Sequence, residues 1–208
     1  MRVELEFRDG TLLLGPPDID PAHVPPDFRR DPREGGRYRA LARCYADAFR
    51  FWKPLGVTVD DKARAYETLD VSFQTIRRPH PHQQEAFDAW TRSRRRGLVV
   101  LPTGSGKTHV ALMAIAAVGR STLILAPTVA LVVQWRRELT AAFGVPVGMI
   151  ANNTYEVCPI TVTTYDSAHR FMDRLGSQFG FIVFDEAHHL PAPAYAPAAA
   201  QCIAPFRL

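Results

Sequence analysis

The sequence predicts an α/β protein in which a parallel sheet flanked by helices follows a smaller α+β domain. From about residue 77 onward, short apolar runs alternate with amphipathic stretches, which is the pattern of βαβ units around a parallel sheet. Before that point the chain is irregular and rich in proline. We therefore expect one domain over residues 1–76 and a second over residues 77–208.

Composition limits the class of protein. The 208 residues include 25 basic and 21 acidic side chains, and the net charge of +4 permits a nucleic-acid partner without indicating one. No apolar run approaches the roughly 20 residues that cross a bilayer, and the first residues lack the apolar core of a signal peptide. The three cysteines are widely separated, which excludes a disulfide framework and disfavours a zinc site. We expect a soluble cytoplasmic protein.

The first domain is expected to begin with a β-hairpin. Two apolar runs, residues 3–7 and 11–14, flank Asp9-Gly10, and glycine accepts the positive φ that a tight turn requires. Six prolines between Pro16 and Pro32 then predict a long loop over residues 15–36. Apolar residues at helical spacing, with no glycine or proline among them, predict a helix over residues 37–51.

The second domain contains the predicted parallel sheet. Its expected strands, apolar enough to be buried on both faces, are residues 97–101, 121–125, 159–163 and 181–184. Its expected helices are residues 82–93, 107–118, 128–143, 166–175 and 194–203.

A glycine-rich loop follows the first of these strands and leads into a helix. It reads Pro102-Thr103-Gly104-Ser105-Gly106-Lys107-Thr108. Gly104 and Gly106 let backbone N–H groups face phosphate oxygens, and the helix N-terminus adds positive partial charge. Lys107 is placed to reach the β- and γ-phosphates, and Thr108 to bind magnesium. An ordinary strand-to-helix turn would not require Lys-Thr at this offset, so we expect a phosphate-binding loop, although Leu101 replaces the first glycine of the general pattern.

An acidic pair ends the last predicted strand. Asp185 and Glu186 follow the apolar run of residues 181–184. Taken alone, such a pair is often charge on a solvated loop. Next to a phosphate-binding loop, however, Asp185 is suited to hold magnesium through a water, and Glu186 to orient and deprotonate an attacking water. The two segments together predict ATP and Mg²⁺ as cofactors.

These segments resemble, in order, the motifs of superfamily 2 helicases. Residues 101–108 resemble motif I, and Asp185-Glu186-Ala187-His188 resembles the DEAH box. The remaining resemblances are residues 81–86 to the motif preceding the P-loop, residues 126–135 to motif Ia, and residues 162–168 to motif Ib. Residues 185–191 and Gln134-Trp135 are similar to XPB-type DNA helicases. Residues 28–33 and 38–40 resemble the damage-recognition domain that precedes the motor in XPB-like proteins.

The resemblance implies a RecA-like motor domain of an ATP-dependent 3'-5' DNA helicase or translocase that serves DNA repair. Its implied partners are duplex or junction DNA and a nuclease. The implied catalytic residues are Lys107, Asp185, Glu186 and His188, the last linking nucleotide state to the DNA-binding segments. The implied nucleotide-binding residues are Gln83 at the adenine edge together with Thr103, Gly104, Ser105, Gly106, Lys107 and Thr108. Thr108 and Asp185 would bind magnesium, and Thr128 and Thr164 would contact the DNA backbone.

XPB-like proteins continue into motif III and a second RecA-like domain. We therefore expect a fragment truncated before motif III, which lacks the second domain's arginine finger and turns ATP over negligibly by itself. Two alternatives remain open. The chain is also compatible with the motor subunit of a restriction or defence system, and with a DNA- and nucleotide-binding module without turnover.

Three lesser features have structural interpretations. The basic run of residues 92–96 is expected to stabilise the C-terminal end of a helix, with contact to the DNA backbone as the alternative. Trp90 and Trp135 lie on apolar helical faces and are expected in the core rather than stacked on bases. His80 and His82 have no partner at zinc-ligand spacing, so we expect loop histidines rather than metal ligands.

Overall fold

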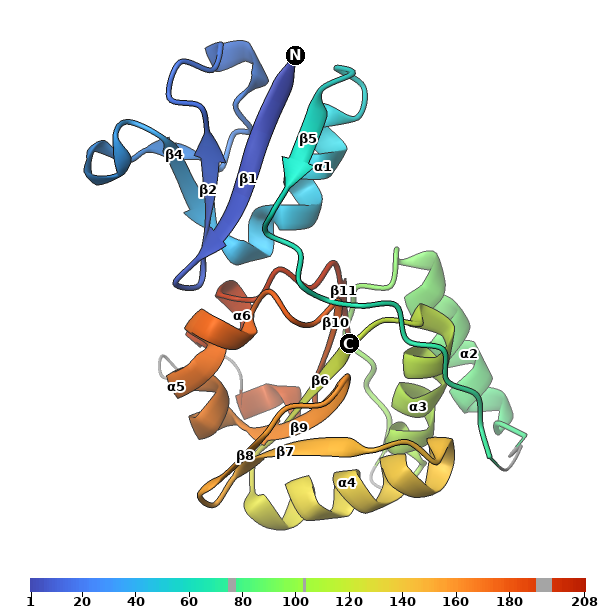
Figure 1. Cartoon of the computed structure of the whole chain (residues 1–208). Helices are drawn as coiled ribbons and strands as arrows, with labels where there is room; N and C mark the ends of the chain where they lie inside the picture. Colours follow the sequence, from blue (N-terminus) through green and yellow to red (C-terminus); the bar gives the residue numbers. More distant parts are fainter. Residues whose placement is uncertain (75–77, 103, 190–195) are drawn as a thin grey trace.

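Two sheets, each with its own core, lie one above the other in the computed structural model, which describes residues 1–74, 78–102, 104–189 and 196–208 (Figure 1). The smaller sheet, at the top of the view, belongs to the first domain, termed the front domain. The larger sheet below it belongs to the second domain, termed the motor domain because its motifs resemble those of helicase motors. The boundary expected at residues 76–77 lies outside the described residues.

The front domain is a five-stranded sheet in the order β3-β4-β2-β1-β5. Its strands are β1 (Arg2–Arg8), β2 (Thr11–Gly15), β3 (Arg29–Arg30), β4 (Tyr38–Leu41) and β5 (Thr58–Asp61). The predicted hairpin is confirmed, because β1 and β2 pair antiparallel around Asp9-Gly10. β5 pairs parallel with β1. Helix α1 (Tyr45–Trp52) packs on the sheet, and Trp52 and Tyr45 share its core with Leu5 and Leu12.

The helix expected over residues 37–51 is wrong in its first half. Tyr38–Leu41 forms β4, a 3-10 turn covers Ala42–Cys44, and the helix begins only at Tyr45. Strand β4 pairs antiparallel with β2, with Thr11 opposite Leu41. The backbone N–H and C=O groups of β4 thus find hydrogen-bond partners in a strand nearly thirty residues earlier. The local spacing of apolar residues cannot predict such a distant partner. The predicted loop is confirmed, since it holds only 3-10 turns (Pro21–His23 and Pro32–Glu34) and the two residues of β3.

The motor domain is a six-stranded sheet in the order β11-β10-β6-β9-β7-β8. Its strands are β6 (Thr122–Ala126), β7 (Val147–Ala151), β8 (Thr154–Glu156), β9 (Ile160–Thr164), β10 (Phe181–Phe184) and β11 (Phe206–Arg207). All pairs are parallel except the β7–β8 hairpin. Three of the four predicted strands are therefore confirmed, whereas β7, β8 and β11 had no prediction.

Helices cover both faces of this sheet (Figure 1). They are α2 (Pro81–Arg92), α3 (Lys107–Val118), α4 (Val129–Phe143), α5 (Tyr165–Leu175) and α6 (Ala196–Ala200), and a 3-10 turn covers Ala187–His189. One core lies between the sheet and α2, α3 and α4, and a second lies between the sheet and α5 and α6. The predicted α/β fold is confirmed. In the described parts of the chain, no helix has the length and apolar character needed to cross a bilayer.

The strand expected over residues 97–101 is wrong. Within the described residues, this segment forms no strand. The residue before it, Arg96, makes a single β-bridge with Arg207 of β11. Leu98 and Val100 are 70% and 81% exposed. The neighbouring strand β11 has two residues, so it offers no ladder partner for the rest of the segment. An apolar run forms a buried strand only where a partner strand continues beside it.

Residues 62–74 connect the two domains and pack along the motor. Three backbone N–H groups donate to motor carbonyls, from Ala65 to Ser177, from Leu69 to Gly119 and from Gln74 to Ala142. The side chains of Leu69, Val71 and Phe73 pack against the larger motor core. In return, Ile203 of the motor is buried in the front-domain core. The connection is thus part of both domains rather than a free linker.

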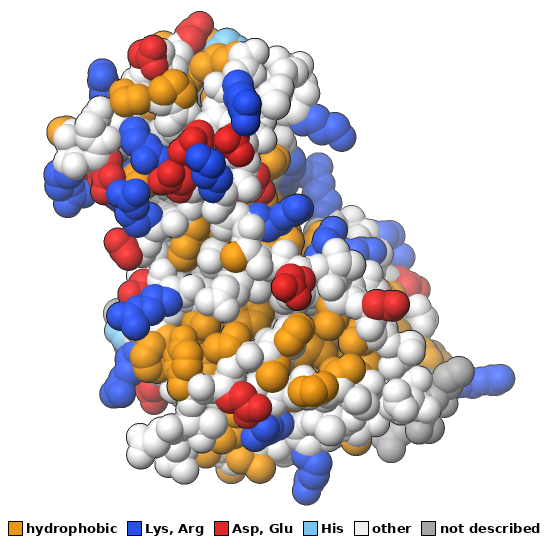
Figure 2. Space-filling view, viewed as in Figure 1, with side chains coloured by type: hydrophobic (Ala, Val, Ile, Leu, Met, Phe, Trp, Pro, Cys, Tyr) orange, Lys and Arg blue, Asp and Glu red, His pale blue; other side chains and the backbone are white. Residues whose placement is uncertain are grey.

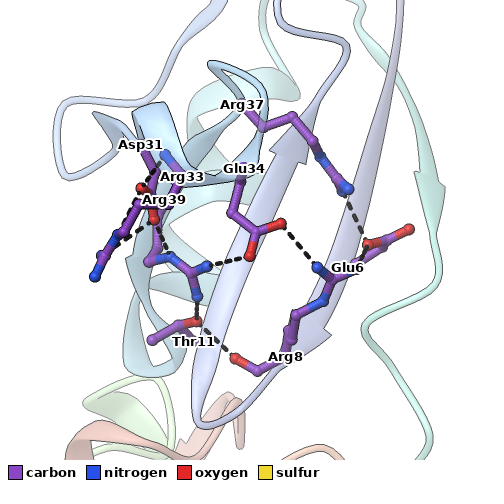
Figure 3. Close-up of polar contacts among 8 residues, drawn as sticks. All are labelled: Glu6, Arg8, Thr11, Asp31, Arg33, Glu34, Arg37 and Arg39. Atoms are coloured by element: carbon purple, nitrogen blue, oxygen red, sulfur yellow. Dashed lines mark hydrogen bonds and ion pairs between the residues drawn. The ribbon is translucent and has the colours of Figure 1, made fainter.

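Charged side chains of both signs lie close together over the front domain, whereas the motor shows more hydrophobic side chains on the same face (Figure 2). Asp31 anchors one group of these charges (Figure 3). It is 5% exposed, and its carboxylate accepts hydrogen bonds from Nε of Arg33 (3.1 Å) and Nε of Arg39 (2.7 Å). Arg39 also donates to Glu34 (3.0 Å). The Arg33 guanidinium, followed by that of Arg39, lowers the pKa of Asp31 to about 2.

We expect Asp31→Asn to lower the melting temperature of the chain by about 5 °C or more, because Arg33 and Arg39 lose their carboxylate. Since the pKa of Asp31 is about 2 when folded and ordinarily 3.8, its stabilisation is complete above about pH 4 and is lost as the pH falls toward 2. Thermal melts followed by circular dichroism should therefore show a difference that shrinks over this range. Asp18→Asn, at an exposed loop position, is the control. Equal melting temperatures for Asp31→Asn and wild type at neutral pH would contradict the role of Asp31.

Candidate functional site

Five of the predicted site residues meet at the carboxyl end of β10, beside the start of α3. They surround a cavity of about 250 Å³. Its polar lining residues are Lys107 and Thr108 from α3 and Asp185, Glu186 and His188 from the segment after β10. Trp135, residues 98–101 and further apolar residues of α3, β10 and the C-terminal segment also line it. The glycine-rich loop and the acidic segment, far apart in the sequence, thus enclose one space.

Two glycines shape the described part of the loop. Gly104 and Gly106 have φ angles of +79° and +81°, in the left-handed region that side chains disfavour. A Cβ at Gly106 would lie 2.3 Å from Nε2 of Gln83, whereas a Cβ at Gly104 would meet nothing within 4 Å. The hydroxyl of Ser105 donates to the carbonyl of Pro102 (2.6 Å). Thr103 lies outside the described residues.

Gln83, expected at the adenine edge, is only 4% exposed and fastens α2 to the loop. Its Nε2 donates to the carbonyl of Ser105 (2.9 Å), and its Oε1 accepts from the backbone N–H of His80 (2.9 Å). Nε2 of His82 lies 2.9 Å from the same Ser105 carbonyl. His82 therefore lies on a helix against the loop, not in a loop of its own. Sequence reasoning missed this contact because its partner is a backbone atom more than twenty residues away.

Asp185 and Glu186 have different surroundings. The half-buried Asp185 carboxylate accepts from Nε1 of Trp135 at Oδ2 (2.7 Å) and from the backbone N–H of Glu186 at Oδ1 (3.1 Å). Glu186 is exposed. Its Oε1 lies 3.9 Å from Nζ of Lys107, and its Oε2 lies 3.4 Å from Nδ1 of His188. Asp185 is thus fixed against the sheet, and Glu186 projects between the loop and His188.

The backbone of Glu186 has a φ of +50°. This left-handed conformation costs about 1–2 kcal/mol for a residue other than glycine. Side chains held in such conformations are concentrated at functional sites, where the surrounding structure imposes them. The carboxylate of Glu186 lies 3.9 Å from Nζ of Lys107.

The donor set fits a magnesium nucleotide. Carboxylate and hydroxyl oxygens, as supplied by Asp185 and Thr108, are ligands that Mg²⁺ prefers. Lys107 and the N-terminus of α3 supply the positive charge that phosphates require. Among the described residues, no three His, Cys, Asp or Glu side chains converge to hold a metal alone. Mg²⁺ usually takes one or two protein carboxylates and completes its shell with phosphates and waters.

Thr128 and Thr164 begin the two helices that follow β6 and β9. The hydroxyl of Thr128 accepts from the backbone N–H of Leu131 (3.3 Å), and that of Thr164 from the backbone N–H of Ser167 (3.1 Å). Because β6 and β9 are adjacent and parallel, both helix N-termini lie at the same edge of the sheet. The structure thus brings together the two residues expected to contact DNA.

Trp90 and Trp135 are buried in the core of the motor, as expected. Each indole also has a specific acceptor, since Nε1 of Trp90 donates to the carbonyl of Arg207 (2.8 Å) and Nε1 of Trp135 to Asp185. In the basic run, Arg92 occupies the last turn of α2, whereas Arg94, Arg95 and Arg96 follow the end of the helix. Within that run, Arg96 lies 3.9 Å from Asp47 of the front domain.

A second aromatic residue holds the acidic segment. The phenol of Tyr165, in the first position of α5, donates to the backbone carbonyl of Asp185 (2.9 Å). Burial, followed by the nearby charges of Asp185 and Glu186, raises the pKa of Tyr165 well above its ordinary value. The phenol therefore remains a donor throughout the physiological pH range. The sequence carried no signal for this contact, because Tyr165 resembles any other core aromatic.

We expect Gly106→Ala to impair the loop more than Gly104→Ala does. Both substitutions meet a positive φ, but only the one at 106 also brings a Cβ against Gln83. Gly104→Ala thus isolates the backbone strain, about 1–2 kcal/mol, from the clash. Urea unfolding and the binding of a fluorescent ATP analogue should both rank the variants in this order. A Gly106→Ala protein that matches Gly104→Ala in both measurements would contradict the close contact.

Comparison with known proteins begins with families. The model of the ResIII family, described as "Type III restriction enzyme, res subunit", matches residues 76–208. The "DNA 3'-5' translocase XPB2" of Sulfurisphaera tokodaii is 34% identical over 171 residues, which covers 82% of this chain and 38% of that protein. The "DNA 3'-5' helicase XPB" of Mycobacterium tuberculosis is 36% identical over 110 residues, which covers 48% of this chain and 20% of that protein. The chain thus spans less than half the length of these relatives.

Solved structures share the fold at low sequence identity. The crystal structure of the UvsW helicase from bacteriophage T4 aligns with a TM-score of 0.57 and 17% identity, over 100% of this chain and 90% of that one. The Sulfolobus solfataricus SWI2/SNF2 ATPase core in complex with dsDNA aligns with a TM-score of 0.52 and 18% identity, over 68% of this chain and 32% of that one. The family match covers more than half of the chain, so the chain belongs to the ResIII family, and it is similar to proteins named as XPB helicases and translocases.

Proposed function

We propose that the chain is the N-terminal part of an ATP-dependent 3'-5' DNA helicase or translocase that acts in DNA repair in the cytoplasm. The observation that carries this proposal is the convergence of the P-loop and the Asp-Glu-Ala-His segment on one cavity, with Lys107 Nζ 3.9 Å from Glu186. Because the chain spans less than half of its relatives, the activity is proposed for the whole protein to which this region belongs.

The proposed nucleotide site divides the work among a few side chains. Backbone N–H groups of the loop and the start of α3 bind phosphate oxygens, and Lys107 contacts the β- and γ-phosphates. Thr108 and Asp185 hold Mg²⁺, which neutralises phosphate charge when bound. Glu186, released from Lys107 when that ammonium turns to phosphate, orients the attacking water and accepts its proton.

The remaining proposed roles belong to residues that surround the phosphate and metal positions. Gln83 supports the loop through Ser105 and contacts the adenine edge, and Thr103 completes the loop. His188, 3.4 Å from Glu186, transmits the state of the nucleotide to the DNA-binding segments.

The proposed DNA contacts are made by Thr128, Thr164 and the helix N-termini that they begin. Hydroxyls and helix N–H groups bind backbone phosphates without reading bases, which suits a motor that moves along any sequence. The relatives named as DNA translocase and DNA helicase, and the neighbour solved with dsDNA, support duplex or junction DNA as the substrate. A partner nuclease and a second RecA-like domain of the same protein complete this proposal.

We further propose that residues 1–76 act as a damage-recognition-like domain. The alignment with the XPB2 translocase is longer than the motor domain, so part of the front domain must be included. The motor subunit of a restriction system is a second candidate, which the description of the matching family as a restriction-enzyme subunit favours. That match covers only the motor, whereas the relative named XPB2 covers 82% of the chain, and we therefore prefer the XPB-like reading.

Replacing Lys107 with alanine should weaken binding of a Mg²⁺-bound fluorescent ATP analogue by at least about 10-fold, because the loop loses its charged phosphate contact. Fluorescence titration of the purified chain measures this directly. Lys53→Ala, an exposed lysine of the front domain, is the matched control and should bind like wild type. The proposed nucleotide site would be refuted by a Lys107→Ala protein that binds the analogue as tightly as wild type does.

We expect the chain of residues 1–208 to hydrolyse ATP slowly even with duplex DNA. None of the described residues that line the cavity is an arginine, and Lys107 is the one lysine among them. An arginine finger contributes about 10³–10⁵ in rate to P-loop enzymes that use one. Phosphate release measured with and without duplex DNA tests this expectation. Robust DNA-stimulated turnover by the purified chain would show that a second domain is not needed.

A further inference from the structure

Asp185 receives hydrogen bonds from two aromatic side chains on two different helices. Nε1 of Trp135, on α4, donates to its carboxylate (2.7 Å), and the phenol of Tyr165, on α5, donates to its backbone carbonyl (2.9 Å). Trp135 is 4% exposed and Tyr165 is 1% exposed. The residue proposed to hold magnesium is thus fixed at both its main chain and its side chain by neutral donors.

We propose that Trp135 is a positioning residue for the metal site, which orients the Asp185 carboxylate toward Mg²⁺ through its indole N–H. This inference rests on the proposed function of the cavity. It goes beyond the expectation that Trp135 only fills the core, because packing alone requires an apolar ring and not a donor at this point.

The lone pairs of the carboxylate support this role. An ionised carboxylate offers about four acceptor positions. Trp135 occupies one on Oδ2, and the backbone N–H of Glu186 occupies one on Oδ1. Each oxygen therefore retains a position for a magnesium ion or its bound water. Because an indole is neutral, Trp135 orients the carboxylate without cancelling the negative charge that attracts the cation, as an arginine in its place would do.

Packing makes the donor rigid. Trp135 lies among Val132, Leu139 and other residues of the larger motor core, and its ring also lines the cavity. A buried indole N–H without an acceptor would be costly, so the ring and the carboxylate constrain each other. The position of Oδ2 is therefore set by α4 rather than by the loop that carries Asp185.

Trp135→Phe tests this inference, since it keeps an aromatic ring in the core and removes the donor. In excess Mg²⁺, the variant should bind a fluorescent ADP analogue about 10-fold more weakly than wild type. In EDTA, without the metal, the two proteins should bind it within about twofold of each other, because the loop is unchanged. Trp90→Phe is the matched control, as it removes a buried indole N–H from the same core that donates elsewhere. It should keep the wild-type dependence on Mg²⁺.

The outcomes separate this inference from the proposed function. If wild type binds the analogue equally with and without Mg²⁺, the proposed metal site itself fails. If wild type depends on Mg²⁺ and Trp135→Phe depends on it to the same extent, Trp135 is only a core residue and the inference is overturned. An equal loss in Mg²⁺ and in EDTA also overturns it, because the defect would then lie in the fold.

A second measurement covers the case in which Trp135→Phe does not fold. The chain has three tryptophans, so the indole ¹⁵N–¹H signals can be assigned with Trp52→Phe and Trp90→Phe. The signal of Trp135 should move when Mg²⁺ and ADP are added and when Asp185 is replaced by asparagine, whereas the signal of Trp90 should stay in place. A Trp135 signal that is insensitive to both changes would overturn the inference.

Discussion

The parallel pairing of β6 with β10 and β9 is the constraint on which the rest of the motor depends. Phe184 lies opposite Leu125, Ala126 lies opposite Thr164, and the backbone N–H of Asp185 continues the ladder by donating to Leu125 (2.9 Å). The three strands are buried on both faces, so polar side chains reach solvent only where the strands end. Because parallel strands end together, Asp185, Thr164 and the start of α4 are brought to one edge of the sheet. Open α/β sheets bind their ligands at this edge.

Sequence patterns predicted the parts of the motor whose signal is local. The start of α3 at Lys107 and the end of β10 at Phe184 follow from apolar runs and helix periodicity, so the loop and the acidic pair were located correctly. The patterns failed where structure depends on a distant partner. Residues 97–101 look like a buried strand, yet β11 supplies only two residues beside them. Residues 38–41 look helical, yet β2 draws them into a sheet.

The same limit applies to the chemistry of the site. Residue type and spacing identify Lys107 and Asp185 as candidates, because their chemistry is carried by the side chains themselves. They do not show that the indole of Trp135 donates to a carboxylate fifty residues away, or that His82 lies against the carbonyl of Ser105. Supporting contacts of this kind depend on how helices pack on the sheet. Only the three-dimensional structure shows them.

In the front domain, the segments that resemble a damage-recognition domain have a structural role. The Asp-x-Arg and Tyr-Arg segments that resemble a damage-recognition domain place Asp31 between Arg33 and Arg39, within hydrogen bonds that join a loop to β4 (Figure 3). Both arginines are paired with acidic side chains, and the Arg33 side chain is nevertheless 84% exposed. The structure thus gives this part of the motif a role in holding the domain together.

Helices α4 and α5 link the proposed DNA contacts to the proposed magnesium ligand, Asp185. Each begins at a threonine proposed to contact DNA, and each carries an aromatic donor to Asp185, through Trp135 and Tyr165. Tyr165 immediately follows Thr164, and Trp135 lies about two turns after Thr128. Because helices move as rigid units, a shift of either N-terminus toward a DNA phosphate would also change the hydrogen bonds at Asp185. Two arrangements of α4 and α5 would then give two geometries of the magnesium ligand, which is the physical requirement for DNA to alter the rate at which such a site hydrolyses ATP.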